Sequence, residues 1–182
     1  MEEVSNYSAI QISKPGGYEQ LKKVSLLGKA STGANLKNVP KEDMVTVNTA
    51  YAGVNYADVC IRWGLYESAK KYVGWPIIPG FEFSGTVSEV GESVTDLKVG
   101  DNVFGLTMFG GYATSIQVPR HQVYHLPEKI NMKEGAAFLC VALTAWYAMH
   151  KQYQPQPGDA VLIHSVAGDF IFFIINIQMI GV

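Results

Sequence analysis

The feature that most constrains the fold is a series of short β-rich segments, separated by turns rich in glycine and proline, that fills the first two thirds of the chain. Residues 7–13 alternate as a half-buried strand does and end at Pro15-Gly16-Gly17, and residues 19–27 fit an antiparallel partner. Further strand patterns cover residues 44–51 (with Val45, Val47 and Thr49 on one face), 83–90, 101–106, 112–118 and 122–126. Many short strands with few helices are typical of a compact, partly closed barrel.

One short helical pattern interrupts the strands. Residues 55–63 change to a helical period, with Asn55 as N-cap, Asp58 at the third helical position and Gly64 as the stop. We expect Arg62, in the last turn of this helix, to be a solvated residue.

The pattern changes near Asn131. Asn131 and Glu134 have the spacing of a capping box, and the helix that they begin should continue to about Gln152, before Pro155 and Pro157. Residues 160–164 then form a continuous apolar run, as in a buried parallel strand. The sequence therefore predicts a mainly β domain over residues 1–131 and an α/β segment over residues 132–182.

Composition excludes several classes of protein. Of the 182 residues, 48% are hydrophobic and 16% are charged, which is typical of a globular protein, and the net charge of -2 without long basic runs argues against nucleic-acid binding. The acidic N-terminus is not a secretory signal, and Cys60 and Cys140 are widely separated, so we expect a cytoplasmic protein with reduced thiols. The apolar residues 170–182 are fewer than the roughly 20 that a transmembrane span needs.

Seven segments, taken together and in this order, carry a family resemblance. They are residues 53–58 (GVNYAD), 62–66 (RWGLY), 79–87 (PGFEFSGTV), 90–91 (VG), 99–103 (VGDNV), 111–113 (GYA) and 143–145 (LTA). The chain resembles the medium-chain dehydrogenase/reductase superfamily, most closely its quinone oxidoreductase group, and residues 79–82 are also similar to the synaptic vesicle membrane protein branch. The resemblance implies a GroES-like, partly open β-barrel, followed by the first helix and strand of an incomplete Rossmann domain. It also implies homodimers among full-length relatives.

The same resemblance argues against zinc. Relatives of the alcohol dehydrogenase type place three zinc ligands where this chain has Asn55, Phe81 and Cys140. An amide is a poor zinc ligand and a phenyl ring cannot be one, so we interpret Cys140 as a small apolar residue on a buried helix face and expect no metal. We expect His121 and His125 to lie at the surface or at a strand edge.

For the active site, the resemblance implies Asn55, Tyr66 and Thr144, with NADPH as cofactor and a quinone or enone as substrate. Asn55 would contact the ribose or nicotinamide side of the cofactor, Thr144 the carboxamide, and Tyr66 a flat conjugated substrate. The residues alone leave other interpretations open: Asn55 as a helix cap, Thr144 bonded to its own helix, and Tyr66 as ordinary packing.

The turn that should hold the cofactor departs from the family pattern. After the apolar strand, Gly168 matches a glycine of the family's Ala-x-Gly-Gly-Val-Gly turn, but Asp169 and Ile171 replace two others. At about 4 Å, a carboxylate and a phosphate charge repel by about 4 kcal/mol at an effective dielectric of about 20. We therefore expect this chain alone to bind NADPH poorly, which leaves three hypotheses: an NADPH-dependent quinone or enone reductase, a catalytically inert truncated binding module, and a membrane-associated adaptor.

Overall fold

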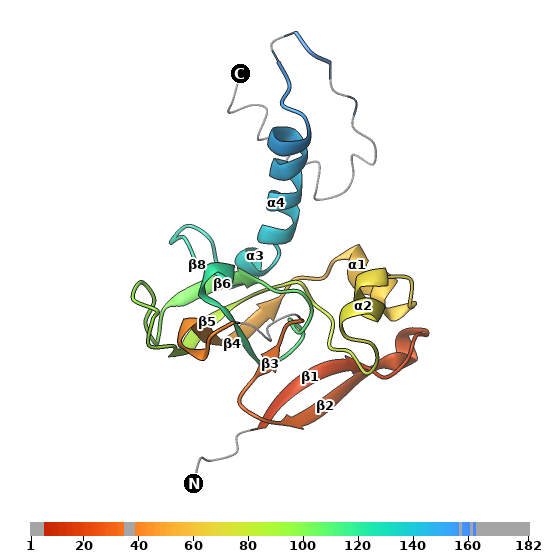
Figure 1. Cartoon of the computed structure of the whole chain (residues 1–182), viewed down its shortest axis with the longest axis vertical. Coiled ribbons are helices and arrows are strands. Elements are labelled where there is room, and N and C mark those ends of the chain that lie inside the picture. Colours follow the sequence, from red (N-terminus) through yellow and green to blue (C-terminus); the bar gives the residue numbers. More distant parts are fainter. Residues whose placement is uncertain (1–5, 35–38, 157, 161, 163–182) are drawn as a thin grey trace. The chain divides into compact units, whose positions relative to one another are not determined.

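The computed structural model describes residues 6–34, 39–156, 158–160 and 162, which are coloured in Figure 1. The chain divides into two compact units, Met1–Ala137 and Phe138–Val182. This division lies a few residues beyond Asn131, where the sequence pattern changes, because helix α3 (Met132–Ala136) packs against strands of the first unit.

A six-stranded sheet forms most of the first unit. Its strands, in spatial order, are β3 (Ser31–Thr32), β7 (Ser115–Pro119), β4 (Met44–Ala52), β5 (Glu82–Val90), β6 (Asn102–Leu106) and β8 (Val123–His125). Neighbouring strands are antiparallel except for the short parallel pair β3–β7. The strands expected over residues 44–51, 83–90 and 101–106 are confirmed within two residues, whereas β7 and β8 are shorter than the patterns that predicted them.

The sheet curls around one apolar core. Buried side chains from five of its strands meet in a single cluster: Val45 and Val47 (β4), Phe83 and Val87 (β5), Val103 (β6), Ile116 and Val118 (β7), and Val123 (β8). Strands at both ends of one sheet can share a core only if the sheet is strongly curved, as in a partly open barrel. Thr49, which was expected on the same face as Val45 and Val47, is half-buried between the exposed Asn48 and Ala50.

A separate hairpin joins the barrel along one side. Strands β1 (Asn6–Ile12) and β2 (Leu21–Leu27) pair antiparallel, as the sequence predicted, and the register runs from Asn6 opposite Leu27 to Ile12 opposite Leu21 (Figure 1). The other edge of β1 bonds to the barrel side, through Ile10 N to Tyr112 O (2.8 Å) and a reciprocal pair between Ile12 and Ile77 (2.9 Å each).

Two short helices cover this junction. Helix α1 (Tyr56–Arg62) begins at Asn55 and ends before Gly64, whose φ of +74° suits glycine; both ends were expected. Helix α2 (Glu67–Tyr72) was not predicted from the sequence. A second apolar cluster lies here, with Ile12, Ile61, Ala69, Ile77 and Phe109 as its buried members.

The expectation for Arg62 was wrong. Arg62 is only 4% exposed, its Nη1 donates to Gly16 O at 2.8 Å, and the guanidinium lies 4.4 Å from the centre of the Tyr18 ring. The β1–β2 turn folds over the end of α1 and provides these partners, and a helical pattern does not reveal such a long-range cover.

The single helix expected from Asn131 to about Gln152 is divided. Asn131 Oδ1 accepts a hydrogen bond from Glu134 N (2.9 Å), which confirms the capping box. Ala137 then leaves the helical region, with φ −114° and ψ 18°, and helix α4 (Leu139–Tyr147) follows in the second unit, continued by a π-helical turn over Ala148–Gln152. Most of the strand expected over residues 160–164 lies outside the described residues.

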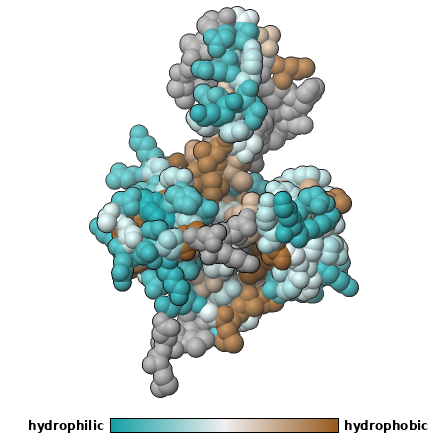
Figure 2. Space-filling model, in the orientation of Figure 1, coloured by the Kyte–Doolittle hydropathy of each residue, from teal (hydrophilic) through white to brown (hydrophobic). Residues whose placement is uncertain are grey.

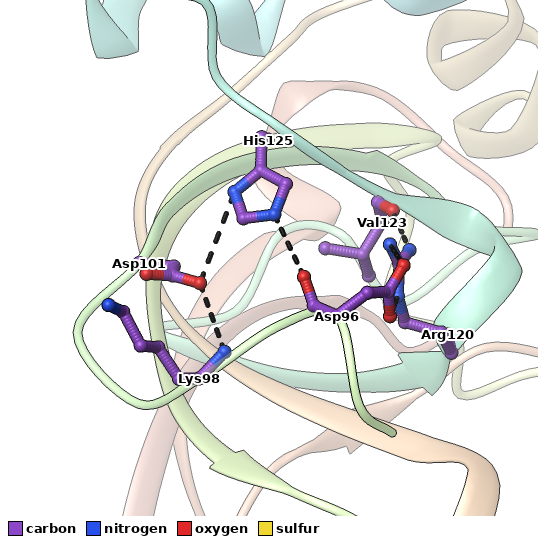
Figure 3. Close-up of polar contacts among 6 residues, drawn as sticks. All are labelled: Asp96, Lys98, Asp101, Arg120, Val123 and His125. Carbon is purple, nitrogen blue, oxygen red and sulfur yellow. Dashed lines mark hydrogen bonds and ion pairs between the residues drawn. The ribbon is translucent and has the colours of Figure 1, made fainter. Parts of the chain in front are cut away.

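A polar cluster fastens the corner between β5 and β6 to β8 (Figure 3). The Arg120 guanidinium donates to both carboxylate oxygens of Asp96 (2.7 and 2.5 Å) and to Val123 O. His125 Nε2 lies 2.9 Å from Asp96 O, with Nδ1 3.9 Å from the carboxylate of Asp101.

His121 and His125 are exposed, as expected, and hydrophilic residues cover most of this side of the barrel in Figure 2.

We predict that Ile116→Ala destabilises the first unit by about 2–5 kcal/mol, because the side chain is fully buried in the barrel core and its loss leaves a cavity. Leu27→Ala is the control, since Leu27 is 80% exposed and should change stability by about 0.5 kcal/mol or less. Urea denaturation measures both; equal effects of the two substitutions would contradict the assignment of the core.

Candidate active site

Asn55 occupies the start of α1, where the chain leaves β4. Its extended backbone (φ −114°, ψ 154°) and the reciprocal contacts with Asp58 form a capping box, in which Asn55 N donates to Asp58 Oδ2 at 2.9 Å. The capping interpretation of Asn55 is therefore confirmed. The residue is half-buried.

The Asn55 amide has a second partner that sequence reasoning missed. Asn55 Nδ2 donates to Glu82 Oε1 at 2.9 Å, and Glu82, the first residue of β5, is only 1% exposed. Gly53 makes room for this carboxylate, because a Cβ at residue 53 would lie 2.5 Å from Glu82 Oε1. The sequence gave only a weak signal for Glu82. It directly follows Phe81, and Phe81 occupies a position where zinc-binding relatives have a ligand.

Asp58 is the centre of a buried hydrogen-bond network. Besides Asn55 N, its carboxylate accepts from Gly80 N (2.9 Å, at Oδ1) and from Tyr112 Oη (2.9 Å, at Oδ2). Burial raises the pKa of Asp58, and the hydrogen bonds from Asn55, Tyr112 and Gly80 partly oppose this rise. The network joins the start of α1 to two loops far away in the sequence.

The pKa of Tyr112 is raised strongly. Burial is the largest cause, followed by the negative charge of Asp58 and its hydrogen bond, and then by the charge of Glu82. Both carboxylates therefore lie close enough to the phenol to disfavour its ionisation, and Tyr112 stays a neutral donor.

An aromatic cluster lies beside the polar network. The Tyr66 ring centre is 5.7 Å from that of Phe81 and 6.2 Å from that of Phe109, and the Phe81 and Phe109 centres are 5.4 Å apart. Tyr66 and Phe81 are half-buried, whereas Phe109 is fully buried. The packing interpretation of Tyr66 is therefore confirmed, and its partial exposure still leaves ring surface for a ligand.

The remaining predicted site residues belong to the second unit or lie outside the described residues. Thr144 belongs to the second unit, on α4, where its Oγ1 donates to Cys140 O at 2.6 Å; the interpretation that Thr144 bonds to its own helix is thus confirmed. Cys140 is half-buried and not buried as expected. Gly168, Asp169 and Ile171 lie outside the described residues. Of the predicted site residues, Asn55 thus contacts Glu82 and Tyr66 contacts Phe81, the residue before it.

Metal ligands do not gather in the part of the chain that the structure describes. No group of three or more histidine, cysteine, aspartate or glutamate side chains there has the geometry to hold an ion. Within the same residues, no helix has the length and apolar composition that crossing a membrane requires.

Comparison with known proteins matches this domain to one family. Residues 41–128 match the alcohol dehydrogenase GroES-like domain. The probable quinone oxidoreductase of Schizosaccharomyces pombe is 37% identical over 162 residues, which are 87% of this chain and 44% of the relative. The synaptic vesicle membrane protein VAT-1 homolog of Homo sapiens is 35% identical over 153 residues, which are 84% of this chain and 36% of that protein.

Solved structures give the same match. The quinone oxidoreductase of Escherichia coli, in a structure complexed with NADPH, superposes with a TM-score of 0.80 at 27% identity and covers 95% of this chain and 49% of its own. The chain thus spans less than half the length of these relatives.

We predict that the Tyr112→Phe variant loses less stability at alkaline pH than the unsubstituted chain does. The pKa of Tyr112 is higher in the folded chain than the value of about 10 in an unfolded one. The contribution of Tyr112 to the free energy of unfolding is therefore complete below about pH 10 and is lost as pH rises further. At neutral pH the variant should lose about 1–3 kcal/mol, since the buried Asp58 carboxylate loses a donor. Urea denaturation at pH 7 and pH 10.5 measures both effects.

The control for this prediction is Tyr124→Phe, because Tyr124 is exposed on β8. It should keep the pH dependence of the unsubstituted chain. An equal alkaline slope for Tyr112→Phe and the unsubstituted chain would contradict the network.

Proposed function

This chain belongs to the quinone oxidoreductase-like group of the medium-chain dehydrogenase/reductase superfamily, and we propose that its first unit is the substrate side of an NADPH-dependent reductase of quinones or enones. Its GroES-like domain is followed by the start of a Rossmann-like region. The observation that carries the proposal is that two family-matched residues contact consecutive residues of the chain: the Asn55 amide donates to Glu82, and the partly exposed Tyr66 ring packs on Phe81.

This arrangement suits a flat, conjugated carbonyl compound. An aromatic ring can stack against a quinone or enone, and an amide N–H can donate to its oxygen, on which negative charge develops during reduction. The cofactor, when bound, supplies the hydride. Asn55 and Tyr66 serve to orient the acceptor and to stabilise its oxygen.

We propose that this chemistry needs no zinc. Asn55 Nδ2 is already committed to Glu82, and Phe81 offers no ligand atom, so two of the three positions at which relatives bind zinc are unsuited to a metal. No disulfide bond joins Cys60 and Cys140, which supports a reducing compartment such as the cytoplasm.

We predict that Tyr66→Ala weakens the binding of tetramethyl-1,4-benzoquinone at least about fivefold, since the ring supplies stacking area worth about 1 kcal/mol or more. This quinone is chosen because its ring positions are substituted and do not add thiols. Quenching of the intrinsic fluorescence measures binding, with Tyr72→Ala as control, because Tyr72 is 43% exposed on α2 outside the cluster. If both variants bind the quinone with equal affinity, Tyr66 is not part of the site.

Asp169 and Ile171 stand where the family turn has glycines, so we propose that the chain as given binds NADPH weakly. The variant with Asp169→Gly and Ile171→Gly should bind NADPH at least about tenfold more tightly, because it removes one like charge and two obstructing side chains. Fluorescence titration with NADPH measures the change. A variant with Asp159→Gly is the control, and tight binding by the unsubstituted chain would refute the proposal.

A further inference from the structure

We propose that Glu82 is a positioning residue: it fixes the orientation of the Asn55 side-chain amide, so that Asn55 presents an N–H group, and not its oxygen, to a ligand. The inference rests on the proposed function, because the ligand that it specifies is the carbonyl oxygen of the substrate. The hydrogen bond between Asn55 Nδ2 and Glu82 Oε1 carries it.

The chemistry of the two side chains sets the orientation. Asn55 Nδ2 is the donor to Glu82 Oε1 at 2.9 Å, and the acceptor-only character of an ionised carboxylate matches this orientation of the amide. The opposite orientation would place the amide oxygen against a carboxylate oxygen, with no donor between them. A buried pair of acceptors without a donor is costly, which makes this orientation the stable one.

The capping box of α1 bears on the other side of the amide. It places the Asn55 side chain toward the backbone N–H of Asp58, and an oxygen is the group that suits a donor on that side. An asparagine side chain has two N–H donors and one oxygen. With the oxygen toward the helix and one N–H on Glu82, one N–H donor is left for a ligand.

Backbone packing holds Glu82 in place. A Cβ at residue 53 would lie 2.5 Å from Glu82 Oε1, 2.6 Å from Glu82 Cγ and 2.5 Å from Ala136 O, so only glycine leaves room for the carboxylate here. Gly53 N also donates to Glu82 O at 3.2 Å. Because Glu82 is only 1% exposed, it has little freedom to release Asn55.

The remaining donor selects for acceptor groups. The hydrogen bond of Asn55 and the ring contact of Tyr66 fall on consecutive residues, Glu82 and Phe81. A quinone or enone oxygen can accept this N–H, whereas a hydroxyl or an amine can do so only with its own donor turned away. Glu82 thus favours the oxidised carbonyl form of a substrate.

The test is an NMR experiment on the 182-residue chain, labelled with 15N in its asparagine side chains. Hydrogen exchange of the Asn55 side-chain amide should be about tenfold faster in Glu82→Gln than in the unsubstituted chain, because glutamine can present either an oxygen or a nitrogen and no longer fixes the amide. Glu89→Gln is the matched control: Glu89 lies on the same strand, is exposed and pairs with Lys29. Unchanged exchange in Glu82→Gln would overturn the proposal.

A double substitution keeps the test decisive if Glu82→Gln folds poorly. Asn55→Asp retains a good helix cap but places a second carboxylate against Glu82, so its Tm should fall. Adding Glu82→Gln should raise the Tm again, because the introduced glutamine can donate to the new carboxylate. If the changes in Tm caused by the two substitutions are simply additive, the proposal is also overturned.

The ligand is tested with tetramethyl-1,4-benzoquinone. It should shift the Asn55 Nδ2 resonance in the unsubstituted chain and in Glu89→Gln, and shift it at least about threefold less in Glu82→Gln, while the Tyr66 ring resonances shift in all three. If the quinone shifts neither residue in any variant, the proposed function fails, whereas the exchange experiment still decides the role of Glu82. Equal Asn55 shifts in all three would overturn the proposal.

Discussion

The architecture around the site depends on one buried carboxylate. Asp58 accepts hydrogen bonds from the backbone of residue 55, the backbone of Gly80 and the phenol of Tyr112, so a single side chain ties together three segments that are distant in sequence. Burying a charge without such partners would be prohibitive. The three donors stabilise the ion, although the raised pKa of Asp58 shows that they do not offset its burial completely. Asn55 and Phe81, which border the site, directly adjoin this anchor.

Local signals predicted much of the fold. The strands, the caps at Asn55 and Asn131 and the stop at Gly64 follow from residue patterns within a few positions, and the structure confirms them. Features that depend on contacts between residues distant in sequence did not follow from these local patterns. Arg62 is buried by the β1–β2 turn, and the expected long helix is interrupted where α3 packs against the barrel, because neither contact leaves a periodic pattern in the sequence.

The site was predictable to a similar extent. Family resemblance selected Asn55 and Tyr66; the structure places Asn55 against Glu82 and Tyr66 against Phe81, and the roles proposed for them in catalysis stay predictions. Glu82 and Tyr112 were missed, because a buried carboxylate and its donor are recognised by their three-dimensional partners and not by spacing. Structural and functional interpretations of Asn55 are also compatible, since an asparagine that caps a helix retains an amide nitrogen for other contacts.

The burial of Arg62 has a mechanical consequence. Gly16 N donates to Arg62 O, Arg62 Nη1 donates to Gly16 O, and the Tyr18 ring covers the guanidinium, so the tip of the β1–β2 hairpin is fastened to the last turn of α1. Asn55 caps the opposite end of that same two-turn helix. The two ends of one short helix are therefore held by different parts of the chain, the β1–β2 turn at Arg62 and the Asp58 network at Asn55.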